Sequence, residues 1–121
     1  MIADRKLNGN WSGNIFINRS YRTPTFQRET AYVLQDDMHM ATLTVEETIF
    51  YAAWCRMSEG TNHEKIIERV DFLLEMMGLE HIRKSIVGDA MHKGISGGQM
   101  KRLSIAVEIV ALPELIFLGE L

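Results

Sequence analysis

The sequence predicts an α/β domain in which a few strands flank a helical subdomain. Two short β-like runs, over 15–18 and 30–34, come before any helical pattern. From 44 to 112, apolar residues recur at helical spacing, and polar N-cap residues mark where helices start. The run 114–118 ends in four consecutive apolar residues, which is typical of a buried parallel strand.

The first two helices of this block have local start and stop signals. Thr44 and Glu47 have the spacing of a capping box, which predicts a helix from there to about Met57. A second helix is predicted over 64–77, because its apolar residues fall on one stripe. Gly78 is a natural stop for it.

The rest of the block is interpreted in the same way. A short helix is predicted over 79–84 and a loop over 86–89. The last helix is predicted over 96–112, and Pro113 ends it. Its expected buried side consists of Met100, Leu103, Ala106, Val107 and Val110.

Composition excludes several classes of protein. The 121 residues carry a formal net charge of −3 and are 46% hydrophobic, as expected for one globular domain, and this mild acidity argues against a nucleic-acid binder. Cys55 is the single cysteine, so there is no disulfide framework, and the four histidines do not have metal-ligand spacing. Residues 1–10 lack the apolar core of a signal peptide. The most apolar stretch, 105–118, is interrupted by Glu and Pro and does not fit a membrane span.

The segment that carries the most chemistry is 93–102, which reads KGISGGQMKR. Gly97 and Gly98 let a phosphate approach the main chain with no Cβ in the way. The start of the helix adds unpaired N–H groups and the positive end of the dipole. Ser96 and Gln99 fit a capping box, so the helix start is specified locally. The pattern predicts a polyanion site.

KGISGGQMKR resembles the signature motif of the ATP-binding-cassette (ABC) transporter ATPase domains, and the basic pair at its end resembles the G subfamily, the White-type half-transporters. The resemblance implies an ABC ATPase domain of the P-loop NTPase type, here mostly the helical subdomain with a few flanking strands of the core sheet. It implies ATP and Mg²⁺ as cofactors. In the family, the motif of one subunit caps the γ-phosphate of ATP held by the other, so Ser96, Gly97, Gly98 and Gln99 would bind nucleotide across a dimer.

Two further motifs, one before and one after this segment, stand in the family's order. Gln35, at the end of the second predicted strand, resembles the Q-loop Gln, whose amide oxygen reaches Mg²⁺ and the attacking water. Glu120 resembles the Walker B Glu that polarises this water, and it is the candidate catalytic residue. Gly119 stands where the family has an Asp that supports the metal, and Leu121 stands where it usually has Pro. The resemblance therefore implies no certain metal ligand, only a possible Mg²⁺ contact from Gln35.

The resemblance divides the chain into part of the core sheet with the Q-loop (1–43), the helical subdomain with the signature (44–112) and the Walker B strand (113–121). The Walker A loop, D-loop, switch His and transmembrane domain have no counterpart here, and no Gly-Lys dipeptide occurs. We therefore expect an incomplete nucleotide-binding domain. It should be marginally stable and prone to associate through its unpaired strand 115–118.

As for function, the resemblance implies an ATP-binding segment that couples ATP binding and hydrolysis to substrate export at the cytoplasmic face of a membrane. Its partners would be a second nucleotide-binding domain and a transmembrane domain. This chain alone is expected to be inactive, because both the phosphate cradle and the Walker B Asp are missing. One alternative is a non-catalytic interaction module or truncated relic that pairs with an intact half-transporter. Another is a generic helical domain with a chance Ser-Gly-Gly-Gln run.

Overall fold

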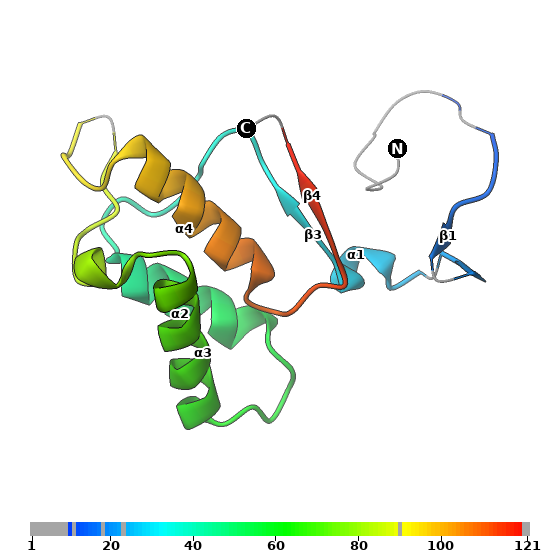
Figure 1. Cartoon of the computed structure of the whole chain (residues 1–121), viewed down its shortest axis with the longest axis horizontal. Helices are drawn as coiled ribbons and strands as arrows, with labels where there is room; N and C mark the ends of the chain where they lie inside the picture. Colours follow the sequence, from blue (N-terminus) through cyan, green and yellow to red (C-terminus); the bar gives the residue numbers. More distant parts are fainter. Residues whose placement is uncertain (1–9, 11, 18, 23, 90, 120–121) are drawn as a thin grey trace.

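The computed structural model describes residues 10, 12–17, 19–22, 24–89 and 91–119. Figure 1 shows a block of helices beside a pair of strands, with a small hairpin beyond them. The elements are β1 (Phe16–Ile17), β2 (Ser20–Tyr21), α1 (Phe26–Glu29), β3 (Thr30–Val33), α2 (Val45–Arg56), α3 (His63–Met76), the 3₁₀ helix η1 (Glu80–Ile82), α4 (Gly97–Ile109) and β4 (Leu115–Leu118).

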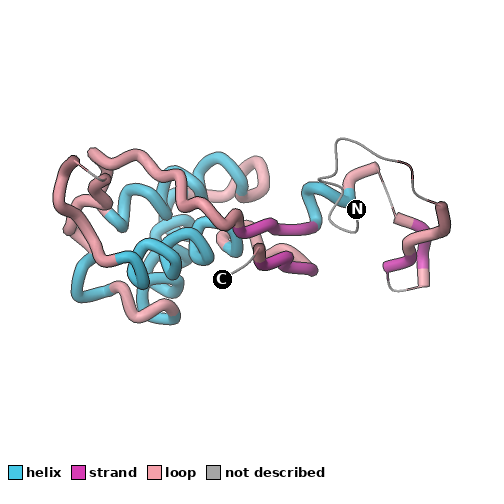
Figure 2. The backbone as a smooth tube through the Cα atoms, turned by 90° about the horizontal axis from the view of Figure 1, so that it is seen from above, coloured by secondary structure: helices cyan, strands magenta, loops and turns pink. Residues whose placement is uncertain are grey.

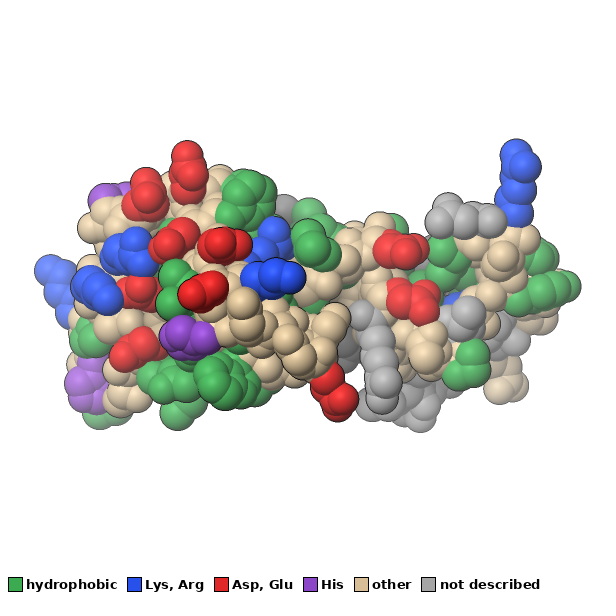
Figure 3. Space-filling view, turned by 90° about the horizontal axis from the view of Figure 1, so that it is seen from below, with side chains coloured by type: hydrophobic (Ala, Val, Ile, Leu, Met, Phe, Trp, Pro, Cys, Tyr) green, Lys and Arg blue, Asp and Glu red, His purple; other side chains and the backbone are tan. Residues whose placement is uncertain are grey.

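The hydrophobic core lies where α2, α3 and α4 pack together. Each helix contributes one apolar face, and Ile49, Leu73 and Leu103 are completely buried there. Full burial of such a side chain stabilises the fold by about 1.5–3 kcal/mol, before the entropy of ordering it is counted. On the face seen in Figure 3, charges of both signs mix over the helical end of the molecule. The core fixes where α4 lies relative to α2 and α3.

The strands form two separate sheets. β3 and β4 pair in parallel, with Thr30 opposite Leu115 and Val33 opposite Leu118. β1 and β2 pair in antiparallel fashion, and Figure 2 shows this hairpin at the end of the molecule opposite the block of α2, α3 and α4. The parallel pair, with helices in the connection between its strands, confirms the α/β class.

Most predicted elements are present, with shifted ends. The start of α2 after Thr44, the end of α3 before Gly78 and the strand β3 agree with the prediction to within one residue. The predicted helix 96–112 is too long, because α4 stops at Ile109 and Leu112 has a left-handed φ of 55°. The predicted helix 79–84 contracts to the three residues of η1.

Two short elements, β2 and α1, were not predicted. The hairpin turns at Arg19, whose φ of 68° is unusual for a residue other than glycine. α1 is a single turn, and it brings Phe26 into a buried position against the Phe117 ring of β4. Elements this short leave no periodic pattern in a sequence.

β4 has the composition of a buried strand but is half exposed. Leu115, Ile116 and Leu118 expose 39%, 42% and 52% of their surface. β3 is its only neighbour in the described part of the sheet. The exposure agrees with the expectation for this strand when the rest of a core sheet is not beside it. Within the described residues, no helix is long and apolar enough to cross a membrane.

Candidate functional site

The predicted capping box at the start of α4 is present. The Gln99 N–H donates to Ser96 Oγ at 3.3 Å, and the Ser96 N–H donates to Gln99 Oε1 at 2.8 Å. The first helical bond runs from the Met100 N–H to the Ser96 carbonyl, at 2.8 Å. These three bonds fix the direction of the first turn.

The first turn presents free main-chain donors to solvent. The N–H groups of Gly97 and Gly98 come before the first helical bond, so the helix supplies no acceptor for them. Both residues are exposed, and a Cβ built on either would meet nothing within 4 Å. The positive end of the helix dipole lies at the same point. This geometry suits a phosphate, because two donors and a favourable field converge with no side chain in the way.

Gln35 and Gly119 meet at the carboxyl ends of β3 and β4. The Gly119 N–H continues the ladder by donating to the Val33 carbonyl at 2.9 Å. Gln35 and Gly119 both line a surface hollow of about 370 Å³, together with Asp36. Sequence reasoning brought Gln35 and Gly119 to one site but missed Asp36, which adds a carboxylate to the hollow. Glu120 and Leu121 lie outside the described residues.

The hollow gives partial support for a divalent cation. Two of the residues that line it, Gln35 and Asp36, carry an amide oxygen and a carboxylate, and Mg²⁺ prefers oxygen ligands of both kinds. Gly119 has no donor side chain, and a Cβ there would lie 3.0 Å from the Val33 carbonyl oxygen. Any larger residue at this position therefore requires a small shift of the strand end.

The two groups of predicted site residues do not come together within one chain. None of the residues 96–99 lines the hollow around Gln35. What joins the two is Lys101, one turn along α4. Its ammonium donates to the carbonyls of Leu34 at 3.3 Å and Gln35 at 2.9 Å, and it pairs with Asp37 at 3.0 Å.

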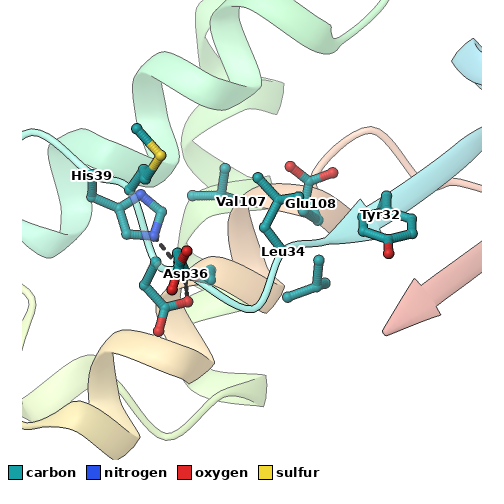
Figure 4. A pocket seen from close by; sticks show the side chains of 10 residues that line it. Tyr32, Leu34, Asp36, His39, Val107 and Glu108 are labelled. Carbon is teal, nitrogen blue, oxygen red and sulfur yellow. Dashed lines mark hydrogen bonds between the residues drawn. The ribbon is translucent and has the colours of Figure 1, made fainter. Parts of the chain in front are cut away.

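A second contact strengthens this connection. The buried Ser104 hydroxyl of α4 donates to Asp37 Oδ1 at 2.5 Å, and His39 Nε2 lies 2.7 Å from the same hydroxyl oxygen. Figure 4 shows the pocket that these residues line, with the loop residues Leu34 and His39 and, from α4, Glu108. Ser104 is not a nucleophile here, because its proton is given to Asp37 and not to the imidazole.

The charges of this network are set by their surroundings. Burial acts to raise the pKa of Asp37, but the hydrogen bonds from Ser104 and Lys101 outweigh it, so the pKa lies below its usual value. Burial lowers the pKa of His39 despite the nearby carboxylates of Asp37 and Glu108. Asp37 is therefore ionised at neutral pH and His39 is neutral, which allows Nε2–H to donate to Ser104.

Comparisons with a family model and with known proteins all identify ABC transporters. The model of the ABC transporter family matches residues 5–121. The chain is 40% identical over 122 residues to ABC transporter G family member 3 of Dictyostelium discoideum, covering 99% of this chain and 9% of that protein. It is 40% identical over 121 residues to the broad substrate specificity ATP-binding cassette transporter of Sus scrofa, covering 99% of this chain and 18% of that protein.

A plant protein is similar to the chain to nearly the same extent. ABC transporter G family member 6 of Arabidopsis thaliana is 38% identical over 120 residues, covering 98% of this chain and 16% of that protein. The chain thus spans less than a fifth of the length of these relatives. The chain therefore belongs to the ABC transporter family, and the relatives from Dictyostelium discoideum and Arabidopsis thaliana are members of its G family.

Proposed function

We propose that this chain is the ATP-binding segment of a G-subfamily half-transporter, in which the start of α4 caps the γ-phosphate of ATP. The observation that carries the proposal is the open first turn of α4. The amides of Gly97 and Gly98 lack helical acceptors, and a Cβ on either residue would meet nothing within 4 Å. Bound ATP supplies the transferable phosphoryl group, and Mg²⁺ neutralises its charge.

The separation of the two site regions supports binding across a dimer. The first turn of α4 faces solvent and does not line the hollow at Gln35. One nucleotide therefore contacts the Ser96 end of one subunit and the Gln35 end of another. Gln35 and Asp36 are the residues that would hold Mg²⁺, and Glu120 would polarise the attacking water.

The wider role is to couple ATP binding and hydrolysis to substrate export. The relatives' names describe transporters, one of them with broad substrate specificity. In this role the chain works at the cytoplasmic face of a membrane, with a transmembrane domain and a second nucleotide-binding domain as partners.

Substitution of Ser96 tests the site. Ser96→Arg fills the first turn with a long side chain and removes the capping hydroxyl. In the full-length protein we expect at least a tenfold loss of affinity for an ATP analogue, because two main-chain donors are screened. Ser58→Arg makes the same change in charge in an exposed loop of the helical block and should bind as the parent does. Equal affinities for both variants would reject the proposal.

A non-catalytic role is the second candidate, and Gly119 favours it. Without a carboxylate at this position, the segment still presents its signature turn to an intact partner. We expect the 121-residue chain alone not to hydrolyse ATP, and its co-purification with an intact half-transporter to depend on ATP. If Gly119→Asp in the full-length protein raises Mg²⁺-dependent hydrolysis, the missing carboxylate is what limits catalysis. Hydrolysis that Gly119→Asp leaves unchanged would exclude this limit.

A further inference from the structure

The contact between α4 and the loop after β3 uses every donor of one side chain. A lysine ammonium has three N–H donors. Those of Lys101 face three acceptors, namely the carbonyls of Leu34 and Gln35 and the carboxylate of Asp37. Because all three acceptors lie on one short stretch of chain, the ammonium fixes this stretch as a unit relative to α4.

The contact is shielded and reinforced. The side chains of Lys101 and Asp37 expose only 25% and 17% of their surface, so water screens the ion pair less than it screens a surface pair. The buried hydroxyl of Ser104 holds the same oxygen of Asp37 from the next turn of α4, at 2.5 Å. Asp37 is therefore held by side chains from two successive turns of one helix.

Lys101 also lies close to the first turn of α4, which Ser96 caps. It follows Gly97 by four residues, which is about 6 Å along the helix axis. A helix transmits a displacement of its first turn to this position with little bending. The main chain of Gln35 is bonded to Lys101 directly, at 2.9 Å.

We propose that Lys101, Asp37 and Ser104 are positioning residues. They hold the peptide of Gln35 at a fixed position relative to the first turn of α4. The coupling half of this inference rests on the proposed function, because it takes Ser96–Gln99 to bind nucleotide phosphate. The anchoring half does not. When a phosphate binds at the start of α4, these contacts, here called the anchor, transmit the displacement of α4 to Gln35. Without the anchor, α4 and the loop that contains Gln35 respond to nucleotide independently.

The test uses two exposed methionines as reporter positions in the full-length protein, on a background with its other cysteines replaced. Met38 exposes 83% of its surface in the anchored loop, and Met91 exposes 90% in the loop before Ser96. Met38→Cys and Met91→Cys are each spin-labelled, and the width of the electron paramagnetic resonance lines reports the mobility of the label. Spectra are recorded without nucleotide and with a non-hydrolysable ATP analogue and Mg²⁺.

Lys101→Met removes the ammonium and keeps most of the stem. Arg56→Met is the matched control, since Arg56 also bonds a carbonyl and a carboxylate on another element, the Val107 oxygen and Glu108. In the parent and in Arg56→Met, both labels should respond to nucleotide. In Lys101→Met the label at 38 should be more mobile without nucleotide and should lose its response, while the label at 91 keeps its own. A role confined to stability would alter both labels together.

Each contrary result has one meaning. If the label at 38 is no more mobile in nucleotide-free Lys101→Met than in the parent, Lys101 does not hold the loop in place. If that label is more mobile but its mobility still changes with nucleotide, Lys101 does not couple the loop to α4. If the label at 91 does not respond even in the parent, the proposed function fails and the coupling fails with it. The nucleotide-free spectra then still decide the anchor.

Discussion

The backbones of Gly88 and Gly94 lie in direct contact just before α4. A Cβ on Gly94 would lie 1.9 Å from the Val87 carbonyl oxygen, and one on Gly88 would lie 2.5 Å from the Gly94 Cα. The Ile95 N–H donates to the same Val87 carbonyl at 3.1 Å. Val87 is in turn held to the segment before α2, through its N–H to Leu43 at 2.8 Å. This crossing fixes the position of Ser96 relative to the helical core.

Gly94→Ala should therefore destabilise the chain strongly. The added methyl overlaps main-chain atoms that cannot rotate away, so the loop must separate, at a cost of at least about 2 kcal/mol. Gly60→Ala is the control, because a Cβ there meets nothing within 4 Å, so its cost is confined to the positive φ of 84°, which Gly94 does not share. Thermal unfolding followed by circular dichroism should show a much larger fall in Tm for Gly94→Ala. Equal falls would mean that the crossing is not tight.

Gly98→Ala should have opposite effects on stability and on nucleotide binding. The position is helical and open, so alanine should stabilise α4 by about 0.5 kcal/mol through its higher helix propensity. The same methyl stands in the path by which a phosphate reaches the amides, so affinity for an ATP analogue should fall about tenfold. Tm and a nucleotide titration of the full-length variant measure the two effects. Tighter binding or a lower Tm would contradict this prediction.

The helix starts could be predicted because their causes are local. The capping boxes at Thr44 and Ser96 each involve residues three apart, and both have the predicted bonds. Gly78 ends α3 with a φ of 64°, a conformation that glycine adopts at little cost. In each case the deciding residues are neighbours in the sequence.

The contacts around Lys101 could not be predicted, because nothing local specifies them. Lys101 and Gln35 are 66 residues apart, and Ser104 and Asp37 are 67 apart. Only the packing of α4 against β3 and its loop brings these residues together. The sequence could place Gln35 after a strand, but not show that its peptide is held from α4.

Arg69 closes the other end of α4. Its Nε donates to the Val110 carbonyl at 3.1 Å and its Nη2 to the Ile109 carbonyl at 2.9 Å. Both carbonyls lie at the end of the helix, where intrahelical donors run out, and that of Ile109 also accepts from the Leu112 N–H at 3.0 Å. Arg69→Met should cost about 1.5–3 kcal/mol, because charge-assisted bonds to partly buried acceptors are lost. Lys65→Met, on the exposed face of α3, should change stability by less than about 0.5 kcal/mol. Urea unfolding of both variants compares them, and similar losses would show that Arg69 does not act as a cap.

Glu46 should make the stability of the chain depend on pH in the acid range. Its carboxylate accepts from Arg83 at 2.5 Å and pairs with Lys84 at 2.5 Å, within the first turn of α2. The hydrogen bonds from Arg83 and then Lys84 outweigh burial and lower its pKa from the ordinary 4.5. A lowered folded-state pKa contributes stability that is fully present above the unfolded value and is lost as the pH falls through the folded value.

The difference in unfolding free energy between the parent and Glu46→Gln should therefore be constant near pH 7, at about 1 kcal/mol. It should start to shrink only below the ordinary pKa of 4.5 and vanish at lower pH, where both side chains are neutral. Urea unfolding over this range measures it, and Glu68→Gln on the exposed face of α3 provides a baseline. A difference that persists in acid would mean that Glu46 acts through packing and not through its charge. One that shrinks already above the ordinary value would mean that the folded-state pKa is raised and that the contacts with Arg83 and Lys84 do not govern it.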